Sequence, residues 1–340
     1  MGSSGLIVSD LALGTMNFGI EPWGCDYQTS RRIIDAYLEA GGTFIDLANV
    51  YAGGESERIV GKCLEGRRHD VILATKCSAP TGPQINRRGS SRYSILVELE
   101  ESLRRLQTDY LDLYYLHLWD PTTPFRESLS ALTDLVRSGK VRYLGVSNYS
   151  GWQISELAAL WNRDICFEPI VSAQEQYSLL FRGVELEVVP TCSHNGIGMV
   201  CFSPLAGGVL AGLYDREKGG PEGERYSAQG SYTQKFKKFY LTERNFDIYE
   251  KVSALAKECG GDSIDLSIAW LLGRPAVTSV LVGPRTPGHL HKYIEAAAFQ
   301  PDAAVLDQLD KISEPELPYP YSNQARYIPD FFGNVDYRRR

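Results

Sequence analysis

Four residues of types that carry out proton transfer lie at, or just beyond, the ends of short apolar runs: Asp46, Tyr51, Lys76 and His117. Asp46 and Tyr51 follow one run, and Lys76 and His117 each close another. If these runs are parallel strands of one barrel, their carboxyl ends meet at one rim and the four side chains converge there. An acid, an ammonium, a phenol and an imidazole together form a site for proton transfer at a carbonyl group.

Each of the four residues has an expected role. A carboxylate within an apolar strand is costly unless it is paired, so Lys76 is the natural partner of Asp46. An ammonium beside Tyr51 would stabilise the phenolate and lower the tyrosine pKa from about 10. Such a tyrosine can protonate a carbonyl oxygen to which His117 donates a hydrogen bond. Taken singly, the residues also fit a solvated lysine, a core tyrosine and a histidine that satisfies a backbone carbonyl.

The elements that would position these residues alternate along nearly the whole chain. Apolar, strand-like runs are separated by segments with helical periodicity. Their hydrophobicity is continuous rather than alternating, which is typical of strands buried on both faces, as in parallel sheets. Eight runs have this character: residues 11–16, 43–48, 71–76, 110–117, 142–147, 170–174, 198–202 and 279–282.

Helical periodicity is clearest in residues 91–106, where apolar residues recur every three or four positions. Ser150 is suited to cap the N-terminus of a second helix, and Gly41 and Gly42 close a third. Eight βα units of this length predict an α/β fold, a (β/α)8 TIM barrel with a β-hairpin at residues 6–10 and long loops on its C-terminal face. A doubly wound sheet is the alternative, but no Gly-x-Gly-x-x-Gly follows the first strand.

Composition describes an ordinary globular protein. The chain has 340 residues, of which 43% are hydrophobic and 23% charged, so one domain over residues 1–340 can bury a core without a metal or a disulfide. We expect a C-terminal extension at about 299–340. The net charge is −7 and the pI is near 5.4, which disfavours binding to nucleic acid or to anionic membranes.

Cysteine usage indicates the compartment. Seven cysteines form no Cys-x-x-Cys pair, so we expect free thiols in a reducing cytoplasm and no metal site. No apolar run approaches the roughly 18 residues of a membrane span. The first residues lack the basic and apolar regions of a signal peptide.

Two further segments have an expected position. Residues 214–242 are rich in Gly, Ser, Lys and Tyr and follow the seventh strand, so we expect a loop that covers a ligand on the active rim. The aromatic residues Tyr319, Tyr321, Phe331 and Phe332 near the C-terminus would fold over the mouth of the barrel or pack on a neighbouring subunit. The second arrangement would make the protein a homo-oligomer.

From Gly5 to about Ala298 the chain resembles the aldo-keto reductase superfamily, and within it the bacterial-type branch with aryl-alcohol dehydrogenase-like and potassium-channel β-subunit-like members. These are NAD(P)H-dependent carbonyl reductases on a (β/α)8 barrel. The motifs that carry the resemblance are Leu13-Gly14-Thr15-Met16-x-Phe18-Gly19, Asp46-x-Ala48-x-x-Tyr51-x-x-Gly54-x-Ser56-Glu57, Thr75-Lys76, Ser102-Leu103-Arg104-Arg105-Leu106-x-Thr108-Asp109-Tyr110 and Gly139-Lys140-x-Arg142-Tyr143-x-Gly145-Val146-Ser147-Asn148. The resemblance implies that Asp46, Tyr51, Lys76 and His117 form the catalytic tetrad, with the tyrosine as general acid.

The resemblance also implies a cofactor site. Ser147, Asn148 and Gln174 would bind the nicotinamide carboxamide, and Tyr177 would stack beneath the ring. Arg285 would bind the 2′-phosphate, which favours NADP(H) and leaves NAD(H) as a second choice, whereas a solvated arginine in a turn is the alternative. The remaining implied cofactor contacts are Gly14, Thr15, Met16, Asp46, Ser203, Pro204, Leu205, Gly207, Leu210, Gly283 and His289.

The chain departs from the pattern of its relatives at four positions. Leu118 follows the histidine where relatives often carry Arg, and Leu213 stands where they often carry a basic residue. His289 and Tyr293 replace a frequent Gln and Asn. These changes alter the polar contacts to the adenine end of the cofactor and the surroundings of the catalytic histidine.

Aromatic residues near the tetrad suggest how a substrate would bind. Phe18, Trp23 and Trp119 would line an apolar mouth together with Tyr51 and His117. Aromatic walls suit aryl aldehydes and also stack against sugar rings. The predicted function is NADP(H)-dependent reduction of an aldehyde or ketone. A sugar or alcohol dehydrogenase and a cofactor-binding regulatory subunit are the alternatives.

Overall fold

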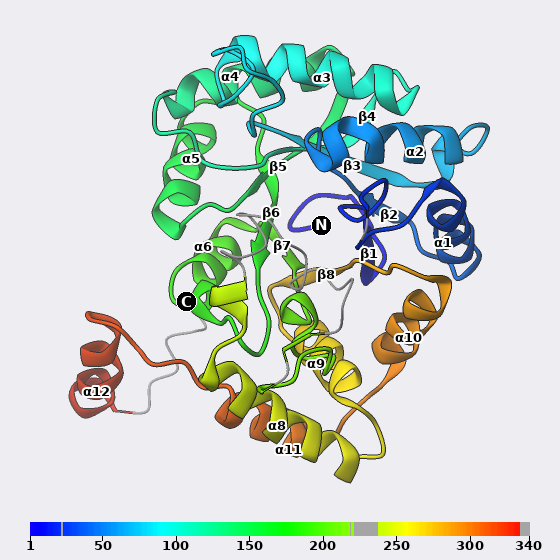
Figure 1. Ribbon diagram of the computed structural model, residues 1–340. Helices are drawn as coiled ribbons and strands as arrows, with labels where there is room; N and C mark the ends of the chain where they lie inside the picture. Colours follow the sequence, from blue (N-terminus) through cyan, green and yellow to red (C-terminus); the bar gives the residue numbers. More distant parts are fainter. Residues whose placement is uncertain (22, 218, 221–236, 334–340) are drawn as a thin grey trace.

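Eight parallel strands close into a barrel in the order of the sequence (Figure 1). The computed structural model describes residues 1–21, 23–217, 219–220 and 237–333. The predicted (β/α)8 barrel is confirmed, and each strand overlaps the run predicted for it. The strands are β1 (Leu11–Gly14), β2 (Phe44–Asp46), β3 (Ile72–Cys77), β4 (Leu111–Leu116), β5 (Val141–Ser147), β6 (Ile170–Gln176), β7 (Gly198–Phe202) and β8 (Val277–Val282).

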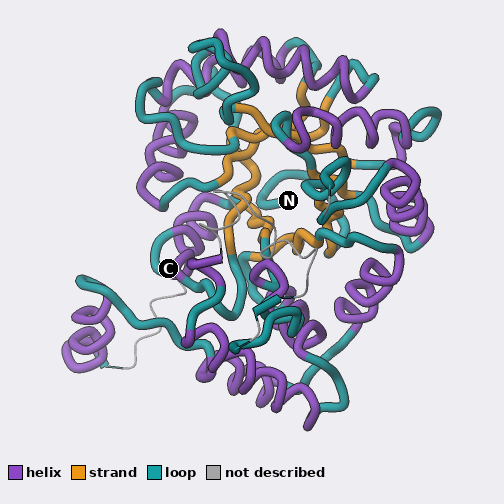
Figure 2. The backbone as a smooth tube through the Cα atoms, in the orientation of Figure 1, coloured by secondary structure: helices purple, strands orange, loops and turns teal. Residues whose placement is uncertain are grey.

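Helices surround the strands as an outer ring (Figure 2). Their starts agree with the sequence signals: Ser91 caps α3 by accepting a hydrogen bond from the amide of Ser94, and Ser150 stands at the N-cap of α5. Among the described residues no helix has the length and hydropathy that a membrane span requires. The helices are α1 (Tyr27–Glu39), α2 (Glu55–Cys63), α3 (Arg92–Leu106), α4 (Phe125–Arg137), α5 (Gly151–Arg163), α6 (Val188–Asn195), α8 (Glu243–Glu258), α9 (Ser263–Leu272), α10 (Pro287–Ala298), α11 (Ala303–Ile312) and α12 (Tyr321–Phe332).

The interior of the barrel is a packed apolar layer. Side chains alternate along each strand between the interior and the helices, and Phe44, Ala74, Tyr115 and Val200 belong to one buried interior cluster. Gly145 leaves space for the Tyr115 ring, because a Cβ at this glycine would lie 2.4 Å from it. Two positions after Phe44, Ala74 and Tyr115, the chain carries the polar residues Asp46, Lys76 and His117.

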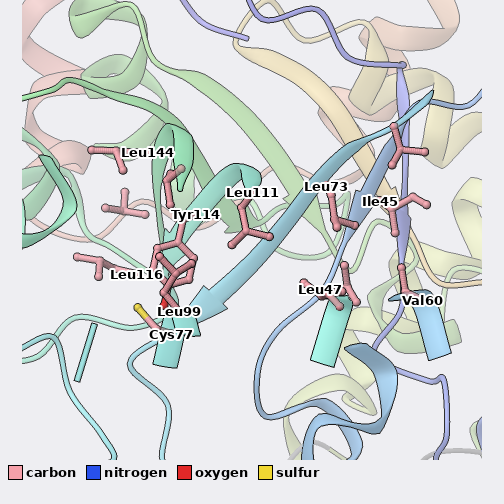
Figure 3. Close-up of a cluster of buried hydrophobic side chains, with 14 of the residues drawn as sticks. Ile45, Leu47, Val60, Leu73, Cys77, Leu99, Leu111, Tyr114, Leu116 and Leu144 are labelled. Carbon is pink, nitrogen blue, oxygen red and sulfur yellow. The ribbon is translucent and has the colours of Figure 1, made fainter. Parts of the chain in front are cut away.

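A second layer of the core lies between the strands and the outer helices. Figure 3 shows a part of it, in which Ile45 and Leu73 of the strands, Val60 of α2 and Leu99 of α3 are among the labelled side chains. These side chains have 4% or less of their surface exposed. Burial of a side chain of this size contributes about 1.5–3 kcal/mol, so this layer holds the outer helices against the strands.

The N-terminal hairpin predicted at residues 6–10 is wrong, since residues 1–10 contain no strand. The segment instead turns on itself, with a hydrogen bond from the Ser4 amide to the Met1 carbonyl. Met1 and Leu6 are buried in the interior cluster of the barrel. A short segment that can bury two apolar side chains in this way gains more than a two-stranded ribbon would provide, because an isolated hairpin is only marginally stable.

The C-terminal part of the chain has two unlike halves. Leu309 of α11 is fully buried in the core cluster that also contains Trp270 of α9. Helix α12 lies at the periphery, away from the barrel axis (Figure 1), and Tyr321 OH donates a hydrogen bond to Glu187 at the start of α6. The side chains of its residues 321–330 are half-buried or exposed. Tyr319 and Tyr321 therefore do not fold over the barrel mouth.

Candidate active site

Unusual backbone conformations gather at the carboxyl ends of the strands. In the described part of the chain, six residues other than glycine have positive φ. Gln107 ends helix α3, whereas the other five follow strands β2, β3, β5 and β7: Ala52, Ser78, Asn148, Ser203 and Ala206. Such conformations cost free energy and concentrate at functional sites. The backbone thus identifies this rim as the candidate site.

Asp46 and Lys76 form an ion pair inside the rim. Neither side chain has any exposed surface. Lys76 Nζ also donates to the Leu47 carbonyl at 2.6 Å, and Gln174 Nε2 donates to Asp46 Oδ2 at 2.8 Å. Burial raises the pKa of Asp46, and Lys76 and Gln174 oppose this shift. Burial alone would lower the pKa of Lys76, but the Asp46 carboxylate and the Tyr51 hydroxyl leave it raised, so the lysine keeps its proton.

Tyr51 is held next to this pair by a tight turn. It begins a 3-10 turn, Tyr51–Gly54, in which Ala52 and Gly53 have left-handed backbone conformations. The turn brings the Tyr51 hydroxyl to 3.5 Å from Lys76 Nζ. The lysine also lies 5.2 Å from the centre of the Tyr51 ring. An ammonium at this distance from a phenol is the arrangement that the sequence predicts.

His117 is the fourth member of the group. Its ring lies 6.1 Å from the Tyr51 ring at an interplanar angle of 81°. Burial, together with the charge of Lys76, lowers the pKa of His117 from 6.5 to about 3, so the imidazole is neutral at physiological pH. Its Nδ1 is buried and has no hydrogen-bond partner. A buried polar atom without a partner is costly. His117 Nδ1 is therefore able to form a hydrogen bond with a bound molecule.

Two buried carboxylates, Glu57 and Glu98, brace strand β3, which carries Lys76, and the turn that carries Tyr51. Glu57 accepts from Thr75 Oγ1 at 2.7 Å and from Arg105 Nε at 2.5 Å. Glu98 accepts from Asn49 Nδ2 at 2.8 Å, and Asn49 lies two residues before Tyr51. These bonds connect the turn after β2 to helix α3, and rigid support of this kind preserves the geometry of a reactive group.

Ser147, Asn148 and Gln174 come together beside Asp46. Ser147 Oγ donates to the Gln174 carbonyl at 2.8 Å, and Asn148 Nδ2 lies 3.1 Å from Ser147 Oγ. Asn148 Nδ2 also donates to the His117 carbonyl at 3.0 Å. A hydroxyl and two side-chain amides can both donate to and accept from a carboxamide. The group, with the open His117 Nδ1 beside it, therefore fits the nicotinamide end of a dinucleotide.

Tyr177 does not lie with this group. It is 2% exposed, its hydroxyl donates to Glu185 Oε1 at 2.7 Å, and its ring packs edge-on against Trp270. It is a core residue, and we do not propose that it stacks on a nicotinamide ring. On β7 an aromatic residue does reach the rim: Phe202, the half-buried last residue of the strand. Phe202 lies two positions after the inward-facing Val200, so period-two alternation along β7 is the signal in the sequence that places it on the inward face.

The loop after β7 has a run of left-handed residues. Ser203, Ala206, Gly207 and Gly208 have φ values of 55°, 49°, 66° and 106°. Turns with left-handed residues can direct backbone amides toward an anion. Pro204, Leu205 and Leu210 are buried, and Leu210 is fully enclosed in the core, so they support the loop from below.

The segment after β8 leads into helix α10. Thr286 caps this helix and accepts from the His289 amide at 3.1 Å. Arg285 is half-buried and His289 exposed, and Arg285 Nη1 lies 3.5 Å from the Trp23 carbonyl. A Cβ at Gly283 would meet no atom within 4 Å. An arginine next to a helix N-terminus and open space is suited to bind a phosphate.

The end of β1 closes the rim. Thr15 is fully buried, and its hydroxyl lies 3.1 Å from the Asp46 carbonyl and 2.8 Å from Ser56 Oγ. Gly14 is the last residue of the strand, and Met16 is half-buried. Thr15 thus supports the backbone of Asp46 from the neighbouring strand.

The predicted aromatic mouth is formed only in part. Trp119, two residues past His117, packs edge-on against Trp152 with ring centres 5.6 Å apart. Trp152 is 55% exposed and was not predicted. Trp23 is half-buried. Phe18 has no exposed surface and belongs to the outer core, so it does not line a mouth.

Two further predictions concern the loop after β7 and metal binding. The ligand-covering loop at 214–242 lies largely outside the described residues, which resume at residue 237. Within the described ranges, no group of three or more His, Cys, Asp or Glu side chains could hold a metal ion.

Comparison with known proteins places the chain among oxidoreductases. The family model described as "Aldo/keto reductase family" matches residues 10–314. An uncharacterized oxidoreductase, YrpG, of Bacillus subtilis is 39% identical over 92% of this chain and 94% of its own length. A probable voltage-gated potassium channel subunit beta of Arabidopsis thaliana is 33% identical, with coverage of 94% and 98%. An aryl-alcohol dehydrogenase [NADP(+)] of Phanerodontia chrysosporium is 31% identical, with coverage of 86% and 79%.

Proposed function

The chain belongs to the aldo/keto reductase family, and on that premise we propose that it is an NADP(H)-dependent oxidoreductase that reduces an aldehyde or ketone to the alcohol, with Tyr51 as proton donor. One observation carries this proposal. The fully buried Lys76, paired with Asp46, lies 3.5 Å from the Tyr51 hydroxyl at the rim of the barrel. The nicotinamide cofactor, when bound, supplies the hydride.

The tetrad residues divide the remaining work. The carbonyl oxygen gains a proton from the Tyr51 hydroxyl as negative charge develops on it. The Lys76 ammonium stabilises the resulting phenolate, and Asp46 keeps the lysine charged and oriented. The neutral imidazole of His117 donates a hydrogen bond to the same oxygen and orients it toward Tyr51. Because its pKa is lowered to about 3, His117 is not itself the acid at neutral pH.

Residues along the rim would hold the cofactor. Ser147, Asn148 and Gln174 bind the carboxamide, and Phe202 offers an aromatic face in place of Tyr177. The turns around Ser203 and Gly207, after β7, bind the pyrophosphate through backbone amides. The ends of β1 and β8 complete the site, and their cofactor contacts are Gly14, Thr15, Met16, Gly283, Arg285 and His289.

The preference for NADP(H) over NAD(H) rests on Arg285. Its guanidinium can bind a 2′-phosphate in bidentate fashion. The aryl-alcohol dehydrogenase relative, whose name includes NADP(+), supports the same choice. The substrate is a small carbonyl compound that enters past Trp23, Trp119 and Trp152, and the aromatic walls favour a substrate with an aromatic ring. All seven cysteines are free, which supports a reducing, cytoplasmic location.

Two other functions would use the same site. A sugar or alcohol dehydrogenase would run the reaction in the oxidative direction. A cofactor-binding regulatory subunit is favoured by the relative named as a potassium channel subunit. A panel of aryl aldehydes, aliphatic ketones and keto-sugars, followed by NADPH absorbance at 340 nm, separates the last function from the enzymes. Tight cofactor binding without turnover on any compound would support the regulatory subunit.

Replacement of the proton donor tests the proposal. We expect Tyr51→Phe to lower kcat at least about 100-fold, the usual contribution of a general acid, while the Kd for NADPH changes less than about twofold. Tyr110→Phe is the matched control, because its hydroxyl bonds to His69 on the opposite side of β4 from the rim. Turnover by Tyr51→Phe at the wild-type rate would refute the role of Tyr51.

A further inference from the structure

A buried carboxyl group, Glu175, lies directly behind the carboxamide-binding group. It is 5% exposed and follows Gln174 on β6. Because side chains alternate along a strand, Gln174 points to the rim and Glu175 points outward, toward the chain that enters helix α5. The acid has no place in the tetrad, and its neighbours explain its position.

Glu175 accepts hydrogen bonds from the backbone rather than from a cation. The Tyr149 amide donates to Glu175 Oε1 at 2.9 Å, and the neighbouring Asn148 amide helps to lower the pKa of this carboxyl group. The same Asn148 amide lies 3.3 Å from the Gln174 carbonyl. One side chain of β6 therefore fixes the backbone that leaves β5.

The turn that Glu175 fixes has a conformation that needs support. Asn148 has a φ of 59°, a left-handed conformation that asparagine tolerates better than most residues but that still costs free energy. In this conformation its side chain reaches both the His117 carbonyl and Ser147 Oγ. The turn thus joins the ends of β4, β5 and β6.

We propose that Glu175 is a positioning residue for the nicotinamide end of the cofactor. By accepting a hydrogen bond from the Tyr149 amide, its carboxyl group holds the turn that presents Ser147 and Asn148 to the carboxamide. The inference rests on the proposed function, because it assumes that these two residues bind the carboxamide.

The surroundings of Glu175 make this support dependent on protonation. The titratable groups that interact with it are Tyr149 before α5, Cys192 of α6 and Cys201 of β7, and none of them carries a positive charge. Burial raises the pKa of Glu175 from 4.5 to about 8, although the two backbone amides oppose the shift. A carboxylate accepts stronger hydrogen bonds than a carboxylic acid, so the turn is held more firmly above pH 8 than below it.

Two substitutions at this position separate positioning from general stability. Glu175→Leu removes the acceptor at similar volume, whereas Glu175→Gln keeps one carbonyl oxygen but cannot ionise. The probes are NADPH and adenosine 2′,5′-bisphosphate, which lacks the nicotinamide. We expect Glu175→Leu to weaken NADPH binding about tenfold, the effect of one lost hydrogen bond, with less than about twofold change for the bisphosphate. Glu175→Gln should restore most of the NADPH affinity.

The pH profile is the second readout. Between pH 6.5 and 9.5, wild-type affinity for NADPH should rise through pH 8, and that of Glu175→Gln should stay flat. Asp112→Asn is the matched control: Asp112 is also buried and accepts a backbone amide, from Leu73 at 2.9 Å, but it lies near the N-terminal end of β4. It should lower the melting temperature and leave the NADPH profile unchanged.

Each contrary result has a distinct meaning. Equal losses for NADPH and the bisphosphate in Glu175→Leu, or wild-type NADPH binding in that variant, would overturn the positioning role. If Glu175→Leu does not fold, identical pH profiles for wild type and Glu175→Gln would overturn it instead. A wild-type protein that binds no nicotinamide cofactor would contradict the proposed function itself.

Discussion

Asp46 and Lys76 form a fully buried ion pair, and such pairs seldom add to stability because both charges must leave water. Gln174 and the Leu47 carbonyl supply additional hydrogen bonds, which lower this cost without removing it. A well-packed apolar pair would stabilise the barrel at least as well. The charge is of use to the neighbouring Tyr51, so the pair fits a chemical role better than a structural one.

The neutral state of His117 gives a prediction about acid stability. Its pKa is lowered from 6.5 to about 3 in the folded protein. Between these values the unfolded chain takes up a proton that the folded chain does not, so stability falls as the pH falls from 6.5 toward 3. At pH 5 the loss amounts to at most about 2 kcal/mol, at about 1.4 kcal/mol per pH unit.

Urea denaturation at pH 7 and pH 5 measures this loss. We expect His117→Gln to lose about 2 kcal/mol less than wild type over this interval, because glutamine does not titrate. His69→Gln, away from the rim next to Tyr110, controls for the removal of a histidine as such. Equal losses in wild type and His117→Gln would mean that His117 is protonated in the folded protein.

Arg285 gives a prediction about cofactor choice. If its guanidinium binds the 2′-phosphate, Arg285→Ala should weaken NADPH binding at least about tenfold, since charge-assisted hydrogen bonds are the stronger class, and leave NADH binding within about twofold. Fluorescence quenching with the two cofactors measures both constants. NADH serves as the internal control, and equal weakening of both cofactors would show that Arg285 does not read the phosphate.

At the scale of elements, the contact between α2 and α3 depends on one glycine. A Cβ at Gly61 of α2 would lie 2.6 Å from the Leu106 carbonyl oxygen at the end of α3. Backbone atoms cannot yield as a flexible side chain can, so Gly61→Ala should lower the free energy of unfolding by about 1–3 kcal/mol. Because α2 follows the Tyr51 turn and α3 carries Glu98, activity should fall with it.

Gly288 of α10 is the matched control for this substitution. A Cβ there would meet only Thr286 Oγ1, at 3.8 Å. Since alanine is the better helix former, Gly288→Ala should raise the free energy of unfolding by up to about 1 kcal/mol. Thermal denaturation of both proteins measures the two effects. A neutral Gly61→Ala would mean that the two helices can move apart without cost.

The elements themselves are largely predictable from the sequence, because burial on both faces gives each strand a continuous apolar run. The N-terminal segment is the exception: Leu6 is apolar because it closes the barrel interior, and its local pattern does not distinguish this from a strand. Tyr177 and Phe202 are a second case in which the local sequence pattern is ambiguous. Both are aromatic and near strand ends, and only the alternation along β6 and β7 separates the core residue from the rim residue.

The candidate site is predictable where side chains act alone and less so where the backbone acts. Asp46, Lys76 and His117 stand out as polar residues at the ends of apolar runs. Glu175 does not, because its role depends on the backbone of the turn after β5, and a single sequence does not reveal that contact. Trp152 is likewise recognised only from its contact with Trp119.

At the scale of the whole molecule, the packed structure consists of the closed barrel and the helices around it, up to and including α11. Trp270 Nε1 of α9 donates to Asp310 Oδ1 at 3.1 Å, and Arg182 donates to Ser313 Oγ at 2.9 Å. These contacts, with the buried Leu309, tie residues 303–313 to the barrel. The family model ends nearby, at residue 314. Residues 303–313, in the first part of the extension predicted at 299–340, are therefore packed as part of the barrel domain.

Truncation at two positions tests where the structural unit ends. Removal of residues 318–340 should shift the melting temperature by less than about 2 °C, since residues 321–330 bury little surface and surface changes are usually within about 0.5 kcal/mol. Removal of residues 300–340 also deletes Leu309 and the Asp310 contacts. It should cost more than about 4 kcal/mol, because loss of one buried leucine side chain alone costs about 2–5 kcal/mol. Calorimetry distinguishes the two outcomes, and size-exclusion chromatography of the shorter deletion shows whether α12 joins subunits. A large loss on removal of 318–340, together with a smaller particle, would mean that α12 packs on a second copy of the chain.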